Sequence, residues 1–197
     1  MKRKICLCCS LSIMALLFMI SCAPTTNLTS VWRDDNYRGN MKNVFVIGAA
    51  QKPGVRRIFE REFVSQLKTH GTNAVASYEY ISDDKMLDKD TVVSTIKNMD
   101  IDAVLVSRLL ERKNIKSYVP GSYQNWHSYY STAYRDSCPP GYVCQEIVAQ
   151  ETNLFDARTE QLVWSAISET FINDGTYELI KSFIKQVIDN LTKENLI

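Results

Sequence analysis

Two cysteines in the second half of the chain, Cys138 and Cys144, stand close enough in sequence to react with each other. A Pro-Pro-Gly segment at 139–141 lies between them, and such a rigid turn can bring two thiols face to face. This spacing predicts a disulfide, and closing so short a loop contributes roughly 2 kcal/mol by chain entropy. A metal site is the alternative, but it needs further ligands and the chain holds only two histidines, His70 and His127.

A third cysteine, Cys22, follows an N-terminal segment with the layout of a secretory signal. Three of the first four residues are basic, residues 5–20 are uncharged and mainly apolar, and the small residue Ser21 precedes the cysteine. A membrane-spanning helix needs ~20 apolar residues, so this run is short for a permanent span. The pattern predicts a signal peptide at 1–21 that is removed, with an uncleaved anchor as the alternative.

The residues around Cys22 also carry a resemblance. Met19-Ile20-Ser21-Cys22 resembles the lipobox of bacterial lipoproteins, although Met19 stands where leucine is usual. The resemblance implies that the Cys22 thiol receives diacylglycerol and that two or three acyl chains then hold the protein on a membrane, at ~0.8 kcal/mol per buried methylene. Ala23 after the cysteine implies sorting to the outer membrane, facing the periplasm. A buried cysteine after an ordinary secretory signal remains the alternative.

The most unusual segment is an aromatic loop at 118–144, which contains the two paired cysteines and many tyrosines separated by small residues. Aromatic side chains with a polar end bury a large area and are enriched at recognition surfaces. We expect this loop to bind a protein or peptidoglycan, since exposed long loops tend to carry function. The alternative is that the loop only covers a sheet edge. The candidate binding residues are Tyr123, Trp126, His127, Tyr129, Tyr130 and Tyr134.

His127 is the candidate for catalysis, as a general base supported by a carboxylate such as Asp136. No serine or cysteine stands in a nucleophile-elbow motif, and Ser165 lies inside a predicted strand without the glycines that such a motif needs. The segment 48–54 follows a strand and precedes a helix, but it lacks the phosphate-binding glycine patterns. We therefore expect no enzyme, cofactor or metal site, with a cell-envelope hydrolase using His127 as the alternative.

Length and charge limit the partners further. Without residues 1–21 the chain keeps 176 residues, enough for one domain with a real core. It then carries 20 basic and 22 acidic residues, whereas nucleic-acid binding needs a basic excess. We expect a membrane contact through the lipid, a protein or peptidoglycan partner and no nucleic acid. A subunit of an oligomeric envelope assembly is a further alternative.

The elements that must position these residues alternate between strand and helix signals. An apolar run at 44–47 predicts a buried strand, and a helix that begins near Pro53 ends before Gly71. Residues 73–81 and 102–106 predict two more strands, with a helix capped by Asp88 or Asp90 between them. This order predicts a β-α-β-α-β unit of an α/β domain.

The rest of the chain changes character. Residues 147–155 and 161–171 predict an antiparallel hairpin, and a closing helix follows Asn173 or Asp174. The fold prediction is therefore an α/β domain with one mixed sheet at 41–197, preceded by a lipidated tether at 22–40. The buried stripe expected on the closing helix consists of Tyr177, Ile180, Ile184, Val187, Ile188 and Leu191.

With these elements placed, the chain resembles a family of bacterial lipoproteins of unknown function. The resemblance implies a small α/β domain after a lipobox cysteine, and it implies no reaction, because the family has no assigned activity. The resembling segments are 29–34 (TSVWRD), 42–48 (KNVFVIG), 56–60 (RRIFE), 102–106 (DAVLV) and 162–166 (LVWSA).

Overall fold

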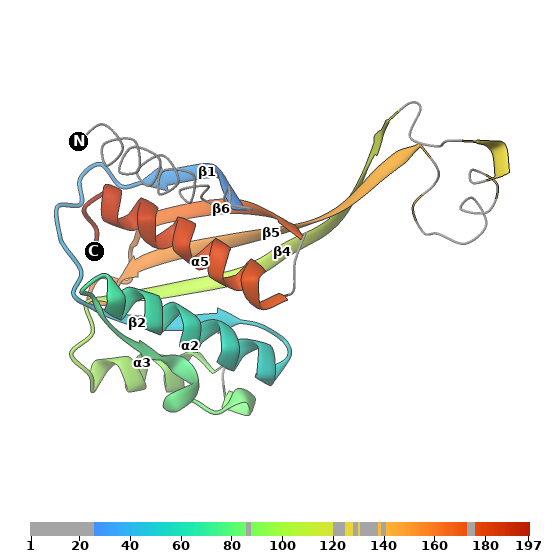
Figure 1. Cartoon of the computed structure of the whole chain (residues 1–197). Helices are drawn as coiled ribbons and strands as arrows, with labels where there is room; N and C mark the ends of the chain where they lie inside the picture. The colour runs from blue at the N-terminus through green and yellow to red at the C-terminus, as the bar shows by residue number, and fades with distance from the viewer. Residues whose placement is uncertain are drawn as a thin grey trace, which may run out of the picture.

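A computed structural model describes residues 26–85, 88–119, 125–127, 130, 138, 141–172 and 176–197. Strands and helices alternate through the first half, and two long strands and a closing helix make up the second (Figure 1). The elements are β1 (Thr26–Arg33), β2 (Asn43–Ala49), α2 (Pro53–Thr69), β3 (Asn73–Ala76), the 3₁₀ turns η2 (Ser77–Glu79) and η3 (Asp83–Lys85), α3 (Lys89–Lys97), β4 (Ala103–Tyr118), β5 (Tyr142–Asp156), β6 (Leu162–Ile172) and α5 (Thr176–Lys193).

The strands form one six-stranded mixed sheet in the order β1-β6-β5-β4-β2-β3. Strand β2 pairs in parallel with β3 and β4, as helical crossovers require, whereas the β4, β5, β6 and β1 neighbours are antiparallel. The predicted α/β architecture is therefore confirmed: a β-α-β-α-β unit, an antiparallel hairpin and a closing helix share one sheet.

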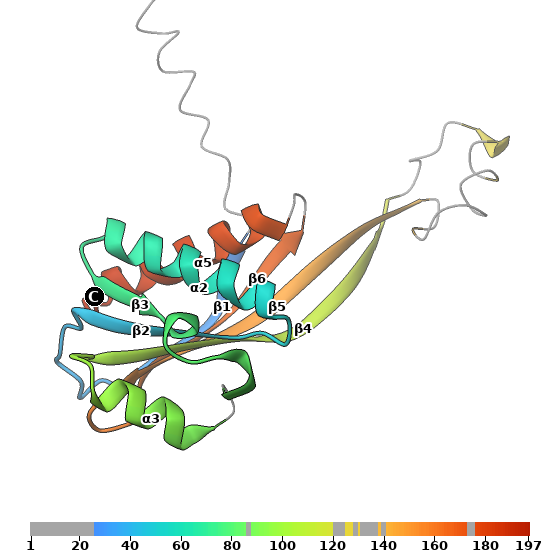
Figure 2. The same ribbon diagram turned by 90° about the horizontal axis from the view of Figure 1, so that it is seen from below.

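Helices α2 and α5 cover one face of the sheet (Figure 2). Phe59 of α2 and Phe183 of α5 pack with ring centroids 5.8 Å apart, and Trp164 of β6 is fully buried in the same core. Each such side chain contributes roughly 1.5–3 kcal/mol by leaving water. The predicted stripe of α5 is buried from Ile180 onward, but Tyr177 is 48% exposed. The closing helix therefore makes its core contacts with its later turns.

Helix α3 lies on the opposite face, over β2 and β4 (Figure 2). Val92 and Ile96 pack against a smaller core that contains Phe45 and Ile47 of β2. As predicted, Asp88 caps this helix, and its carboxylate accepts the Asp90 N–H at 3.2 Å.

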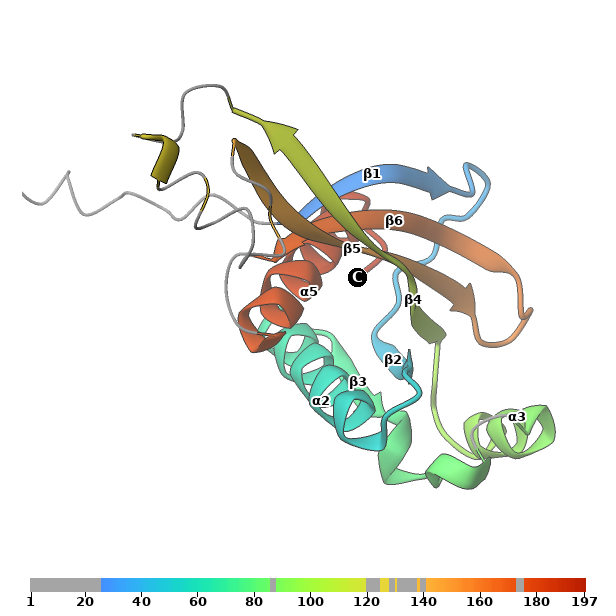
Figure 3. The ribbon, with the colours of Figure 1, turned by 90° about the vertical axis from the view of Figure 1, so that its right-hand side faces the viewer.

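The structure corrects three predicted boundaries. Residues 26–33, predicted as tether, form edge strand β1 beside β6 (Figure 3), so the folded domain begins before residue 41. The strand predicted over 73–81 ends at Ala76, where η2 begins. The strand predicted over 102–106 continues to Tyr118, and β5 starts at Tyr142. Edge and projecting strands meet water on more than one side, so their sequences lack the apolar alternation of core strands.

Candidate functional site: the β4–β5 arm

The segment predicted as a loop is carried on a long projection of β4 and β5. We call this projection the arm and define it as residues 109–118 of β4 and 142–150 of β5, which pair from Leu109 and Gln150 to Tyr118 and Tyr142. Strand β2 stops pairing with β4 at Arg108, and β6 pairs with β5 only as far as Glu146. The outer part of the arm is therefore a two-stranded ribbon that extends beyond the rest of the sheet (Figures 1 and 2).

A break in the strand register marks the point where the arm leaves the sheet. The β4–β5 pairing shifts between Leu109 and Glu111, directly after the last β2 partner of β4. A β-bulge adds one residue to one strand, bends it and increases its twist. Leu110, the extra residue, is 41% exposed. The bulge thus separates the part of β4 that belongs to the core from the part that projects.

The two faces of the arm differ in chemistry. Partners across an antiparallel ladder point to the same face, and successive residues alternate. One face carries Ile115 and Val143, which are 39% and 47% exposed, near its outer end, and the ion-paired Lys113 and Glu111 nearer the sheet. The other face carries Lys116 and the Tyr118–Tyr142 pair, whose ring centroids lie 5.3 Å apart. The outer end of the arm therefore presents an apolar patch on one side, called the apolar face below, and an aromatic surface with a lysine on the other.

The segment between the two strands of the arm, residues 119–141, contains the predicted binding residues, and we call it the tip. Trp126 is 78% exposed and Tyr130 is 60% exposed. The His127 ring lies 5.7 Å from the Trp126 ring in an edge-on arrangement. The structure therefore brings Trp126 and His127 into contact and leaves a large aromatic surface in water. The other predicted binding residues, Tyr123, Tyr129 and Tyr134, lie outside the described residues, as does Cys22.

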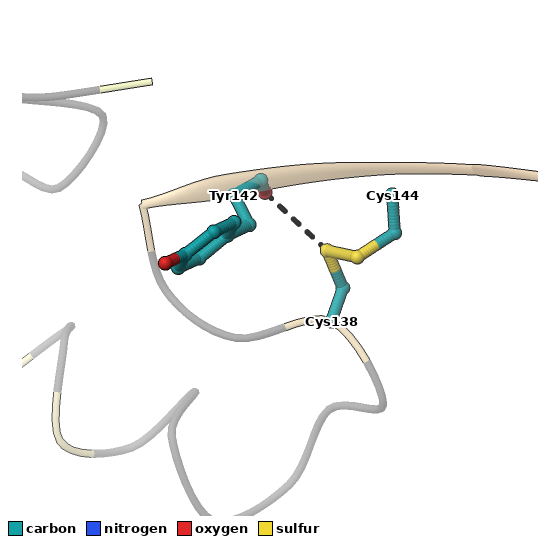
Figure 4. Close-up of a disulfide and its surroundings, with 3 residues drawn as sticks. All are labelled: Cys138, Tyr142 and Cys144. Carbon is teal, nitrogen blue, oxygen red and sulfur yellow. Dashed lines mark hydrogen bonds between the residues drawn. A yellow bond between two sulfur atoms is a disulfide. The ribbon is translucent and has the colours of Figure 1, made fainter. Parts of the chain in front are cut away.

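A disulfide closes the base of the tip (Figure 4). Cys138 and Cys144 are bonded with their Cα atoms 5.7 Å apart, within the normal span of a disulfide. Cys138 Sγ lies 3.3 Å from the carbonyl oxygen of Tyr142. Because a disulfide sulfur carries no proton, this is a contact and not a hydrogen bond. The bond attaches the chain leaving the tip to the last residues of the arm.

Ion pairs join β4 and β5 within the arm and directly next to its base. Arg108 Nε lies 2.5 Å from Glu151 Oε2, and Arg112 Nη1 lies 2.9 Å from Glu146 Oε1. Both arginines are more than half exposed, so each pair contributes only ~0.2–1 kcal/mol. Their main effect is on register, because a shifted pairing of β4 with β5 would separate the opposite charges.

Sequence reasoning missed a buried polar cluster between α2, η2 and η3. Arg56 and Glu60 are 2% and 0% exposed, and the Ser77 hydroxyl donates to Glu60 Oε1 at 2.7 Å. Arg56 Nη1 lies 2.6 Å from Asp83 Oδ1. The only sequence signal is the i,i+4 spacing of Arg56 and Glu60, which is common on exposed helices. These contacts hold the two 3₁₀ turns on α2.

The catalytic alternative gains no geometric support from the described residues. The His127 ring lies against the Trp126 ring, and Asp136 lies outside the described residues. Within the described part of the chain, no group of three or more His, Cys, Asp or Glu side chains is arranged to hold a metal ion. Among the same residues, none of the helices has the length and apolar character of a membrane span.

Comparisons with known proteins find similarity at the level of structure. No family model matches the sequence, and no curated protein does. The PelC dodecamer structure from Paraburkholderia phytofirmans aligns with 14% identity and a TM-score of 0.49, over 84% of this chain and 96% of that one. Lipoprotein GNA1162 from Neisseria meningitidis aligns with 14% identity and a TM-score of 0.44, over 77% and 98%. These structures thus include a lipoprotein and an oligomeric protein.

Proposed function

We propose that this protein is a lipid-anchored component of the bacterial cell envelope that acts by binding, without catalysis, through the arm and its aromatic tip. The observation that carries the proposal is the exposure of Ile115 and Val143 on a ribbon that leaves the sheet, and of Trp126 in the segment beyond it. An isolated two-stranded ribbon is marginally stable in water, and contiguous exposed apolar surface marks interaction sites. The arm would therefore gain stability from being covered by a partner.

The apolar face of the arm suits a protein partner. Ile115 and Val143 lie on the same face of neighbouring strands, and Val119 continues this face with 41% exposure. Burying such side chains contributes ~25 cal/mol per Å² of apolar surface. Peptidoglycan is the other partner expected from the sequence, because the aromatic rings of the tip can stack on sugars. Neither partner requires a catalytic residue.

The anchor in this proposal is Cys22, at the end of the lipobox-like segment. Lipidation there would place the domain at a membrane of the cell envelope, and Ala23 favours the outer membrane, facing the periplasm. Only three residues separate Cys22 from the first residue of β1. The domain would therefore stay close to the lipid surface.

Photo-crosslinking in intact cells tests the binding role. A crosslinkable residue at Ser117, next to Val143 on the apolar face, should capture a partner, and Ile115→Ser with Val143→Ser should abolish capture at equal protein abundance. The matched control is Val55→Ser with Ile58→Ser, which removes two apolar side chains of similar exposure, 41% and 39%, from α2. This control should leave capture unchanged.

The identity of the captured species separates the alternatives. A different envelope protein or a glycan strand supports the proposal, and a second copy of this chain supports the oligomeric assembly. If Ile115→Ser with Val143→Ser retains capture, or if the equally stable α2 control loses capture to the same extent, the arm is not the binding surface. Turnover of purified cell wall by the wild type that is lost in His127→Ala would instead favour the hydrolase.

A further inference from the structure

The start of β1 and the base of the arm lie at the same end of the sheet. Thr26 pairs with Thr170, Thr170 pairs with Val148, and Val148 pairs with Arg112. This row crosses four adjacent strands from the first residue of β1 to the arm. The segment that contains Cys22 therefore enters the domain on the side from which the arm projects.

The lengths of the chain from Cys22 to Thr26 and of the arm follow from covalent geometry and can be compared. The four-residue step from Cys22 to Thr26 spans at most ~14 Å even when fully extended. Strand β5 continues from Val148 to Tyr142, six residues that cover ~20 Å in the direction of the arm. A bilayer that holds the lipid on Cys22 is thus within reach of the arm, whose tip extends further than the tether can.

The side chains at the end of the arm match the interfacial region of a bilayer. Tyr118, Trp126, Tyr130 and Tyr142 are 42–78% exposed. Tryptophan and tyrosine concentrate at the headgroup level of membranes, where one end of the ring is apolar and the other is hydrated. None of these four rings belongs to the hydrophobic core formed by the described residues. A lipid interface covers their apolar edges and still hydrates their polar ends.

The charge at the end of the arm also favours a lipid surface as its partner. Among the described basic residues of the arm, Arg112 and Lys113 form ion pairs with Glu146 and Glu111, and Lys116 forms none. Lys116 lies on the same face of the arm as the Tyr118–Tyr142 pair. A basic residue near a surface rich in anionic lipid contributes ~1 kcal/mol of attraction. Lys116 therefore gives the aromatic face of the arm one positive charge that can attract phosphate headgroups.

We infer that the end of the arm is a second membrane contact, in which Trp126, Tyr130 and the Tyr118–Tyr142 pair lie among the headgroups of the bilayer that holds Cys22. The inference rests on the proposed function, because it requires the lipid at Cys22. It assigns the tip to lipid, and the apolar face of the arm remains available to the protein partner. Two attachments would also fix the orientation of the domain, which a single flexible tether does not.

Tryptophan fluorescence of the full-length lipidated protein tests the inference. The chain has three tryptophans, and Trp32→Phe leaves the exposed Trp126 and the fully buried Trp164. This variant is incorporated into vesicles of phosphatidylethanolamine and phosphatidylglycerol, with or without bromine near the top of the acyl chains. Brominated lipid should quench the Trp126 emission. The matched control, Trp32→Phe with Trp126→Phe, should lose that quenching and keep only Trp164 emission.

The outcomes separate the two proposals. Equal emission from brominated and plain vesicles, with the protein floating with the vesicles, would overturn the membrane contact while the anchor stands, and would leave a protein or glycan as the occupant of the tip. Protein that does not float with either kind of vesicle would contradict the lipid anchor itself. Quenching that persists in the Trp126→Phe control would place Trp164 near lipid and would also overturn the inference.

Discussion

Arg56 Nε donates to Glu60 Oε1 at 3.0 Å, and both side chains are removed from water inside the domain. The same carboxylate accepts the Gly48 N–H at 2.9 Å and, through Oε2, the Tyr78 N–H at 2.9 Å. One helix residue therefore joins the end of β2 to the turn after β3. A buried pair of this kind is costly to break, because removal of one partner leaves the other charge desolvated and uncompensated.

We expect Arg56→Gln to lower the free energy of unfolding by ~3–5 kcal/mol, because Glu60 keeps its charge and loses its cation. The neighbouring Arg57 is 65% exposed and lies 3.6 Å from Asp83. Arg57→Gln should therefore change stability by no more than ~0.5 kcal/mol. Urea unfolding at neutral pH measures both variants. Equal losses in the free energy of unfolding would mean that burial does not make the ion pair of Arg56 more important for stability than that of Arg57.

The sequence predicts the helices and strands better than it predicts which of their side chains are buried. Phe59, Phe63 and Leu67 recur at helical spacing, so the buried face of α2 follows from periodicity. The burial of Arg56 does not, because it depends on η2 and η3 folding back over α2. Periodicity also assigns Val55 and Ile58 to the buried face, and the structure leaves both exposed. The prediction is wrong at this end of α2, where Arg56 and Glu60 are the buried side chains.

The indole of Trp164 provides a second prediction. Its Nε1 donates to Asn190 Oδ1 of α5 at 3.0 Å, in a core where the ring is fully buried. Asn190→Ala removes the acceptor, so we expect a loss of ~1–3 kcal/mol for the unpaired N–H. A double-mutant cycle with Trp164→Phe checks this assignment. If Asn190→Ala costs the same in the Trp164→Phe background, the loss comes from packing of Asn190 and not from the hydrogen bond.

The arm shows why the candidate site was predicted only in part. The aromatic residues and the Cys138–Cys144 spacing identify the segment from composition alone. The strands that carry it place charged residues such as Lys113 on the same face as Ile115, so no continuous apolar stripe marks them in the sequence. A strand that leaves the core has no buried face to impose alternation, so its extent depends on pairing with a distant partner strand. That pairing is a tertiary property.

The turn between β5 and β6 gives a pH prediction. Burial alone would raise the pKa of Asp156, but hydrogen bonds from the Thr159 N–H and hydroxyl and from the Arg158 N–H outweigh it, so the pKa lies below the ordinary 3.8. A lowered pKa stabilises the fold above the unfolded value and loses that contribution as pH falls through the folded value. Asp156→Asn should therefore flatten the loss of stability below about pH 4.

Urea unfolding at several pH values between neutrality and acid measures this slope. Thr159→Val removes the hydroxyl donor, which lies 3.0 Å from Asp156 Oδ1, and should flatten the slope in the same direction by a smaller amount. An unchanged slope in Asp156→Asn would mean that other carboxylates account for the acid dependence of stability.

The position of the disulfide sets its expected effect on stability. Chain entropy alone would assign roughly 2 kcal/mol to closing so short a loop. That contribution reaches global stability only if the tip unfolds together with the core. The tip is joined to the core through a ribbon whose outer part has neither β2 nor β6 beside it. Regions with few buried contacts open locally, at a lower free energy than the core.

We therefore expect Cys138→Ser with Cys144→Ser to change the global free energy of unfolding by no more than ~0.5 kcal/mol, while backbone amides of Val143 and Gln145 exchange faster with solvent. Hydrogen exchange and urea unfolding of the same variant provide the two measurements. Amides of Phe45 and Leu105 in the core strands are the internal control, and their exchange should not change. If the full ~2 kcal/mol is lost and core amides exchange faster as well, the arm unfolds as one unit with the core.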